Sequence, residues 1–188
     1  MQRLLIILAS AALLLYPVAV YFGLQYFEPR LLGLLLLAVL ILRFSLLIKT
    51  IQLKQLKPLA GISIASALIA LLIVFFNEPF YIRLNPVIIN VSLFILFSYT
   101  LFKPPSMIER FARLQTPELP VQAIHYTKTV TKVWCGFFVF NIGASTYTAL
   151  YSSLEMWTLY NGLIAYILMG IIFAIEYTVR TIKIKSTS

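Results

Sequence analysis

Two adjoining stretches of the chain decide the expected fold. The first is VIINVSLFILFSYTLF, residues 87–102, and the second is KPPSMIERFARLQTPELPVQAIHYTKTVTK, residues 103–132. The first has no charged side chain, and a helix over it spans about 24 Å, close to the thickness of bilayer hydrocarbon. The second holds five basic side chains, four prolines and the only histidine. The pair therefore predicts a membrane helix followed by a polar segment outside the bilayer.

The composition extends this interpretation to the whole chain. Of the 188 residues, 61% are hydrophobic and only 11% are charged, whereas soluble domains carry roughly 25% charged residues. We therefore predict an all-α, polytopic membrane protein that forms a single domain over residues 1–188, with six helices in three hairpins. The apolar runs that predict these helices are 4–22, 31–48, 59–76, 87–102, 133–151 and 162–177.

The positions of the basic residues predict the orientation. If the N-terminus is inside, all of the 15 Lys and Arg residues except Arg30 and Arg83 fall on inner segments. Such a bias favours both termini in the cytoplasm. The net charge of +9 is then a topology signal, and we expect no nucleic-acid partner. We expect 4–22 to stay as a helix, because it offers no good pair of small residues for signal-peptide cleavage.

The segment 104–132 predicts two helical parts. Ser106 and Glu109 have the spacing of a capping box, and Glu109 and Arg113 have the spacing of a helical ion pair. Four apolar side chains gather on one side of this short helix, which predicts an amphipathic helix that lies on the inner leaflet with its apolar face down. These side chains are Met107, Ile108, Phe111 and Leu114.

A second helix is expected to begin near Val121 and to run into the fifth apolar run. His125, Lys128 and Lys132 recur on it at spacings of three and four, as one basic stripe above the membrane. With Arg110 and Arg113, this stripe is suited to attract anionic lipid headgroups, a phosphorylated ligand or an acidic protein. The plainer alternative is that these charges only set the topology.

Polar side chains inside the apolar runs are the other candidate sites. Asn90, Asn141 and Asn161, with Ser145, are expected to bond to neighbouring helices, or alternatively to line a polar cavity. Cys135 is expected to be a small buried hydrophobe.

Two glycines, Gly136 and Gly143, are expected on a face of the fifth membrane helix where another helix packs closely.

The residue inventory excludes several kinds of chemistry. The chain contains no aspartate, and His125 is its only histidine, which removes aspartate-rich metal sites, histidine–aspartate acyl transfer and zinc ligand sets. We therefore expect no catalytic residues, no metal and no cofactor, and an enzyme is the less favoured class.

Five strings resemble a known family. They are YPVAVYFGLQYFEPR, NPVIIN, PPSMIERFARLQTPELP, YTKTVTKVWCGFFVFN and WTLYNGLIAYILMGIIFAIEY. The family consists of small bacterial inner-membrane proteins encoded in gene clusters for aryl-polyene pigments and related fatty-acid-synthase-like lipid pathways. It carries no assigned activity, so the resemblance transfers no catalytic residue.

The resemblance implies a context of acyl carrier proteins, synthases and export. We expect an accessory protein that docks an acidic carrier protein or synthase beside membrane lipids. One alternative is a lipid or polyene translocation component, with a path lined by Asn90, Asn141, Asn161 and Glu176. Another is a structural subunit of a membrane enzyme.

Arg43 and Glu176 are the two charges inside apolar runs, and we predict that they pair across the second and sixth runs. The alternative is that each side chain reaches the cytoplasmic interface separately, since both lie near the inner ends of their helices. An unpaired charge at a helix centre costs about 2.5–3.5 kcal/mol, so neutralising either one should lower the thermal stability of the protein in detergent. A double variant with the two charges exchanged should recover it, and failure of that recovery would exclude the pair.

Overall fold

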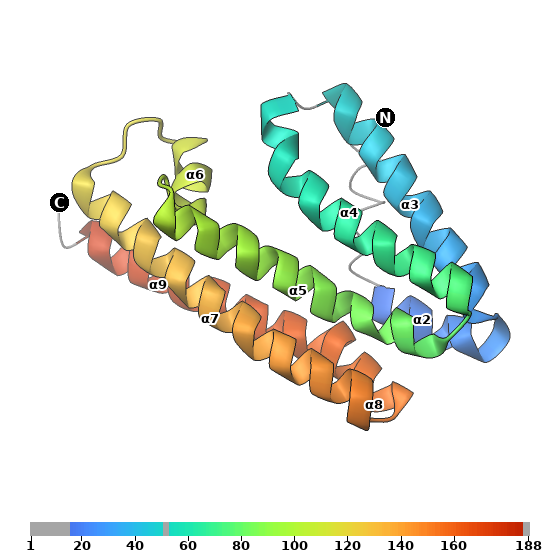
Figure 1. Ribbon diagram of the computed structural model, residues 1–188. Helices are drawn as coiled ribbons and strands as arrows, with labels where there is room; N and C mark the ends of the chain where they lie inside the picture. The colour runs from blue at the N-terminus through green and yellow to red at the C-terminus, as the bar shows by residue number, and fades with distance from the viewer. Residues whose placement is uncertain (1–15, 51–52, 186–188) are drawn as a thin grey trace.

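The computed structural model describes residues 16–50 and 53–185, and within them the side chains of 17–42, 45 and 64–182. This part of the chain is helical, without strands, as predicted (Figure 1). Its elements are α2 (Tyr16–Tyr26), α3 (Pro29–Thr50), α4 (Leu53–Phe76), α5 (Pro79–Phe102), α6 (Met107–Arg113), α7 (Val121–Tyr151), α8 (Leu154–Leu159), a π-helical turn η1 (Tyr160–Ile164) and α9 (Ala165–Lys185).

The long helices form two groups that diverge from one end of the molecule. Figure 1 shows the α3–α4 hairpin leaning away from the group formed by α5, α7 and α9. The groups meet where the α2–α3, α4–α5 and α7–α8 connections lie, which we call the turn end. The opposite end of the second group carries α6 and is called the α6 end.

Among the residues that the structure describes, three helical stretches are long and apolar enough to cross a membrane, by length and composition. They are Pro79–Phe102, Val121–Tyr151 and Leu154–Ile182. The predicted first span, 4–22, lies largely outside the described residues. The second and third predicted spans contain shorter apolar stretches, Pro29–Leu42 and Ile64–Phe76. The count of six spans therefore stays a prediction.

The fourth helix begins earlier than its apolar run predicts. We expected it to start at 87, after Pro86, but α5 starts at Pro79 and passes through Pro86. Proline is well suited to the first turn of a helix, where its missing N–H leaves no bond unmade. The carbonyl of Pro86 is taken by the side-chain amide of Asn90 at 2.8 Å. This bond does not replace the one that the proline removes, which would have joined its missing N–H to the carbonyl four residues earlier.

The last apolar run is also longer and less regular than 162–177. It is helical from Leu154, where the Ser153 hydroxyl accepts a bond from the Met156 N–H at 3.4 Å. At η1 the Ala165 N–H donates to the Tyr160 carbonyl, five residues back. The Asn161 side chain donates to the Trp157 carbonyl at 2.9 Å. This polar side chain competes with the regular backbone ladder and accompanies the local π-helical turn.

The core of the second group is aromatic. Phe97 of α5 and Phe138 of α7 meet edge to face with ring centroids 5.0 Å apart. Trp134 of α7 reaches Phe173 of α9 with centroids 4.8 Å apart. Rings in such pairs contribute about 0.5–1.5 kcal/mol beyond the area they bury. These rings hold α9 to α7.

Close packing in the α3–α4 hairpin depends on Gly33. A Cβ at this position would lie 2.8 Å from Cγ2 of Ile73 on α4, which is closer than carbon atoms approach without displacement. The absent side chain therefore lets α3 and α4 pack tightly, with Leu36, Leu40 and Ala70 buried nearby.

The turn end is tied together by Arg30 and Asn77. Asn77 follows α4 with φ of 54°, a left-handed conformation that Asn tolerates better than most residues. Its Oδ1 accepts the Arg30 N–H at 2.8 Å, and Arg30 Nε donates to the Val74 carbonyl at 3.0 Å. The start of α3 and the end of α4 thus satisfy each other's free backbone groups.

Arg83 has a similar but more enclosed role on α5. Its Nη2 donates to the Thr148 carbonyl at 2.7 Å, to the Ser152 carbonyl, and to the Ser153 carbonyl at 3.4 Å. The Trp157 indole N–H in turn donates to the Arg83 carbonyl at 3.0 Å. A guanidinium at the carbonyl end of a helix is favoured by the helix dipole. Arg83 therefore joins α5, α7 and α8.

Replacing Arg83 with Gln should destabilise the protein by about 1.5–3 kcal/mol, the range for hydrogen bonds to charged groups. Thermal unfolding in detergent measures this loss. Arg30→Gln is the matched control, because it removes the same charge at the more exposed site and should cost less, about 0.5–1.5 kcal/mol. An equal or smaller loss in the Arg83 variant would contradict the capping role.

Candidate functional site

The α6 end is built on two threonines buried among apolar residues. The Met107 N–H donates to Thr100 Oγ1 of α5 at 2.9 Å. The Ile108 N–H donates to Thr131 Oγ1 of α7 at 3.2 Å. The first N–H groups of a helix have no partner inside the helix, and here they are satisfied by neighbouring helices. This arrangement fixes α6 to both α5 and α7.

Glu109 completes the attachment from inside α6. Its side chain is buried, and its Oε2 accepts the Ser106 N–H at 3.3 Å, which is the glutamate half of the predicted capping box. Its Oε1 receives both Nε and Nη2 of Arg113, at 2.9 and 2.8 Å, as the predicted ion pair. Arg113 Nη1 continues to the Pro117 carbonyl at 2.9 Å. The pair therefore holds the turn that follows α6.

Arg110 is also used within the fold. Its Nε donates to the Pro105 carbonyl at 2.8 Å, and its Nη2 lies 3.5 Å from the Lys103 carbonyl. Arg110 and Arg113 were predicted to contact a partner together with the stripe. Both guanidinium groups bond within the α6 end, and their contact with a partner stays a prediction.

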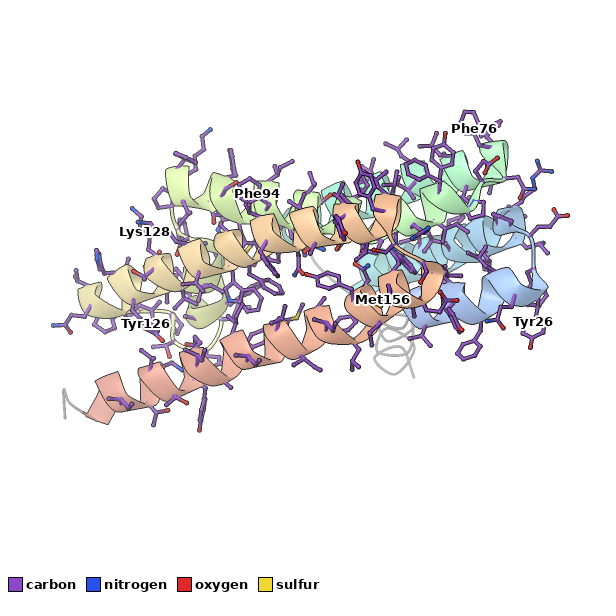
Figure 2. All side chains as sticks on the ribbon, turned by 90° about the horizontal axis from the view of Figure 1, so that it is seen from below. Tyr26, Phe76, Phe94, Tyr126, Lys128 and Met156 are labelled. Atoms are coloured by element: carbon purple, nitrogen blue, oxygen red, sulfur yellow. The ribbon has the colours of Figure 1, made fainter. Side chains whose placement is uncertain are left out.

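The stripe of His125, Lys128 and Lys132 lies on the outer face of α7. All three side chains are exposed, while Thr127, Val130 and Thr131 on the opposite face are buried. Within the part of the chain that the structure describes, these three basic side chains make no hydrogen bond or ion pair. Figure 2 shows Lys128 and Tyr126 on different sides of α7. The prediction of one continuous helix from Val121 through the fifth apolar run is confirmed.

Asn141 and Asn161 lie in a buried polar cluster towards the turn end. Asn161 Oδ1 accepts the Ser145 hydroxyl at 2.7 Å, and its Nδ2 lies 3.3 Å from Thr148 Oγ1. Asn141 Oδ1 accepts the Tyr160 hydroxyl at 2.6 Å. These bonds join α7 to η1 and the end of α8, as expected for polar groups that link membrane helices.

Asn90 and Glu176 are separate from this cluster. Asn90 bonds within its own helix, as described above. Glu176 Oε1 lies 3.5 Å from Arg180 Nε, and the Tyr126 hydroxyl donates to the Glu176 carbonyl at 3.1 Å. Glu176 is 15 residues beyond Asn161, or roughly 22 Å along a helix. The side chain of Arg43 lies outside the described residues, so its pairing with Glu176 stays a prediction.

Two expectations about small residues have different outcomes. Cys135 is buried beside Phe97 and Trp134, as predicted. Gly136 and Gly143 were expected on a close-packed face, but both are exposed, and a Cβ at either position would meet nothing within 4 Å. The prediction was wrong because the packed face of α7 is the aromatic one, turned towards α5 and α9.

The sequence did not single out Arg83, Thr100 or Thr131, although these residues position the helices. Arg83 had one usable signal, because it is one of only two basic residues on the predicted outer side. Thr100 and Thr131 had no such signal, because the sequence of an apolar run does not distinguish a buried threonine from one that faces lipid.

No group of three or more His, Cys, Asp or Glu side chains suited to a metal occurs among the described residues. Searches against protein-family models, curated proteins and solved structures find no match. The resemblance to the aryl-polyene cluster family therefore stays an expectation.

Glu109→Ala should loosen the α6 end, because it removes both the bond to the Ser106 N–H and the pair with Arg113. The expected loss is about 1–2 kcal/mol, with faster tryptic cleavage after Arg113. Glu109→Gln is the matched control: its amide oxygen can still accept the Ser106 N–H, so its cleavage should be intermediate. Unchanged cleavage in the alanine variant would show that Glu109 does not hold this segment.

Proposed function

We propose that this protein is a six-span bacterial inner-membrane protein with both termini in the cytoplasm, and that its α6 end is a docking platform for an acidic cytosolic protein. The partner is an acyl carrier protein or synthase of an acyl-chain or aryl-polyene lipid pathway, held beside the membrane. The protein acts as an accessory component without catalytic residues of its own.

The observation that supports this proposal most is the contrast between two sets of basic residues. Arg110 and Arg113 are bonded within the α6 end. His125, Lys128 and Lys132 lie on one exposed helix face, and the described part of the chain supplies them with no carboxylate. An external anion can therefore approach these charges without breaking a bond inside the described part of the protein.

The rigidity of the surrounding structure favours recognition of a shaped partner. The stripe is on a 31-residue helix, and α6 is bonded to that helix through Thr131. The Glu109–Arg113 pair orders α6 itself. A pre-ordered charged surface loses less conformational freedom on binding than a flexible one. The positive charge of the surface also raises the rate of encounter with an oppositely charged protein.

The translocation alternative receives less support from the geometry. Asn141 and Asn161 bond to Tyr160, Ser145 and Thr148, all within the protein. Glu176 is far along α9 from this cluster. The polar groups that would line a path are thus occupied in linking helices.

Photocrosslinking in cells tests the proposal. Photoreactive residues at Gln122 and Thr129, both exposed beside the stripe, leave the basic residues intact, and Met156 at the turn end is the control position. We expect a cytosolic acidic protein to be captured at the two first positions only, with mass spectrometry identifying it. Lipid adducts alone, or the same adducts at Met156, would contradict docking.

Charge reversal then tests the role of the stripe. Lys128→Glu with Lys132→Glu should reduce capture at least about tenfold, because each basic side chain contributes about 1 kcal/mol of attraction near an anionic surface and reversal adds repulsion. Lys128→Glu alone is compared with Lys183→Glu, which changes the net charge equally but lies on α9 and off the stripe. Equal losses in these two variants would show a general charge effect instead of a site.

A further inference from the structure

The apolar face of α6 is divided between the protein core and the surface. Met107 in its first turn is 6% exposed, and Ile108 packs against the aromatic core. Phe111 and Leu114 continue the same face, since residues four and seven positions apart lie above one another on a helix. They are 54% and 76% exposed. The sequence prediction that the whole face lies on the leaflet is therefore wrong for the first turn.

This division follows from how α6 is placed. Its N-terminal turn is bonded to α5 and α7, and Figure 1 shows the helix turned out of the line of α5, across the end of the group. The first turn is therefore covered by the two helices beneath it. The second turn extends past their edge, so its apolar side chains face whatever surrounds the helices at that level.

The apolar surface of the candidate membrane helix α5 reaches the same level. Phe102, its last residue, is 85% exposed, and Ile95 is exposed further along the helix. Lys103 follows Phe102 directly, with its ammonium 5.4 Å from the centroid of the Tyr99 ring. Arg110 bonds the Pro105 carbonyl, and its Nη2 lies 3.5 Å from the Lys103 carbonyl. Neither cation makes an ion pair with a described carboxylate. Exposed apolar side chains flanked by unpaired cations at the end of a membrane helix are typical of the interface between lipid headgroups and acyl chains.

We propose that the second turn of α6 is a lipid anchor, with Phe111 and Leu114 seated in the headgroup region of the leaflet and Lys103 and Arg110 beside the lipid phosphates. The anchor fixes the height of α6, and through Thr131 the height of the stripe on α7. It rests on the membrane placement proposed above but not on the identity of any docked protein.

Spin-label accessibility in vesicles tests this anchor. Cys135 is the only cysteine, so Cys135→Ala gives a background in which Leu114→Cys carries a single nitroxide. Full-length protein is reconstituted into vesicles of phosphatidylethanolamine and phosphatidylglycerol. Collision of the label with oxygen, which is concentrated in lipid, is compared with collision with a water-soluble nickel chelate. Ile95→Cys is the control for acyl chains and His125→Cys the control for water.

We expect the Leu114 label to collide more with oxygen and several-fold less with nickel than the His125 label, with the Ile95 label still more protected from nickel. A Leu114 label as open to nickel as the His125 label would overturn the anchor. Protection of Leu114 from both reagents would mean that protein covers it, which also overturns the proposal. If the Ile95 label collides with nickel as often as the His125 label, the placement of α5 in the membrane is wrong, and the test then bears on that placement and not on the anchor alone. A label at Phe111 should repeat the Leu114 result and guards against a local effect of one substitution.

Discussion

A guanidinium from α5 holds the carbonyl end of α7, and the relation between these two helices follows from that contact. Arg83 bonds the Thr148, Ser152 and Ser153 carbonyls, which fixes how far α5 and α7 slide along each other. The same register brings Phe97 against Phe138 in the middle of the group. At the other end it places Thr100 and Thr131 where each receives an N–H of α6. The cap at one end and the bonds to α6 at the other therefore depend on the same register of α5 and α7.

The basic residues fall into two groups, according to whether the surrounding protein supplies hydrogen-bond acceptors for them. A guanidinium presents its N–H donors in a fixed, planar arrangement. The donors of Arg30, Arg83, Arg110 and Arg113 all bond to backbone carbonyls or to Glu109. Lys128 and Lys132 have compact, mobile charges on an exposed face. In the described helices, these arginines therefore serve mainly the fold, whereas the lysine side chains of the stripe make no hydrogen bond or ion pair within the described part of the chain.

Sequence patterns predicted the features that depend on local composition. The apolar runs from 31 onward all fall within helices, and the spacing of Glu109 and Arg113 predicted their pair because both lie on one short helix. The start of α5 was missed because the prediction followed the apolar run, which begins at 87, whereas the helix itself begins at Pro79 and includes the polar residues before the run.

Features that depend on which helix packs on which face were beyond the sequence. Gly136 and Gly143 have the spacing of a packed stripe, yet α7 turns its aromatic face inward. Met107 and Leu114 share one side of α6, yet only Met107 is covered. In both cases the pattern shows which side chains share a face, but only the neighbouring helices decide what that face contacts.

The buried Glu109 shows most clearly what the α6 end is built to do. Removing a carboxylate from water costs several kcal/mol unless it is paired and hydrogen-bonded, and a connector between two membrane helices needs no such group. Here the carboxylate is satisfied by Ser106 and Arg113, and it orders α6 and the turn that follows. Ordering this segment places an apolar edge on one side of the α6 end and a basic face on α7. A rigid surface with those two properties suits a protein that holds a soluble acidic partner next to lipid.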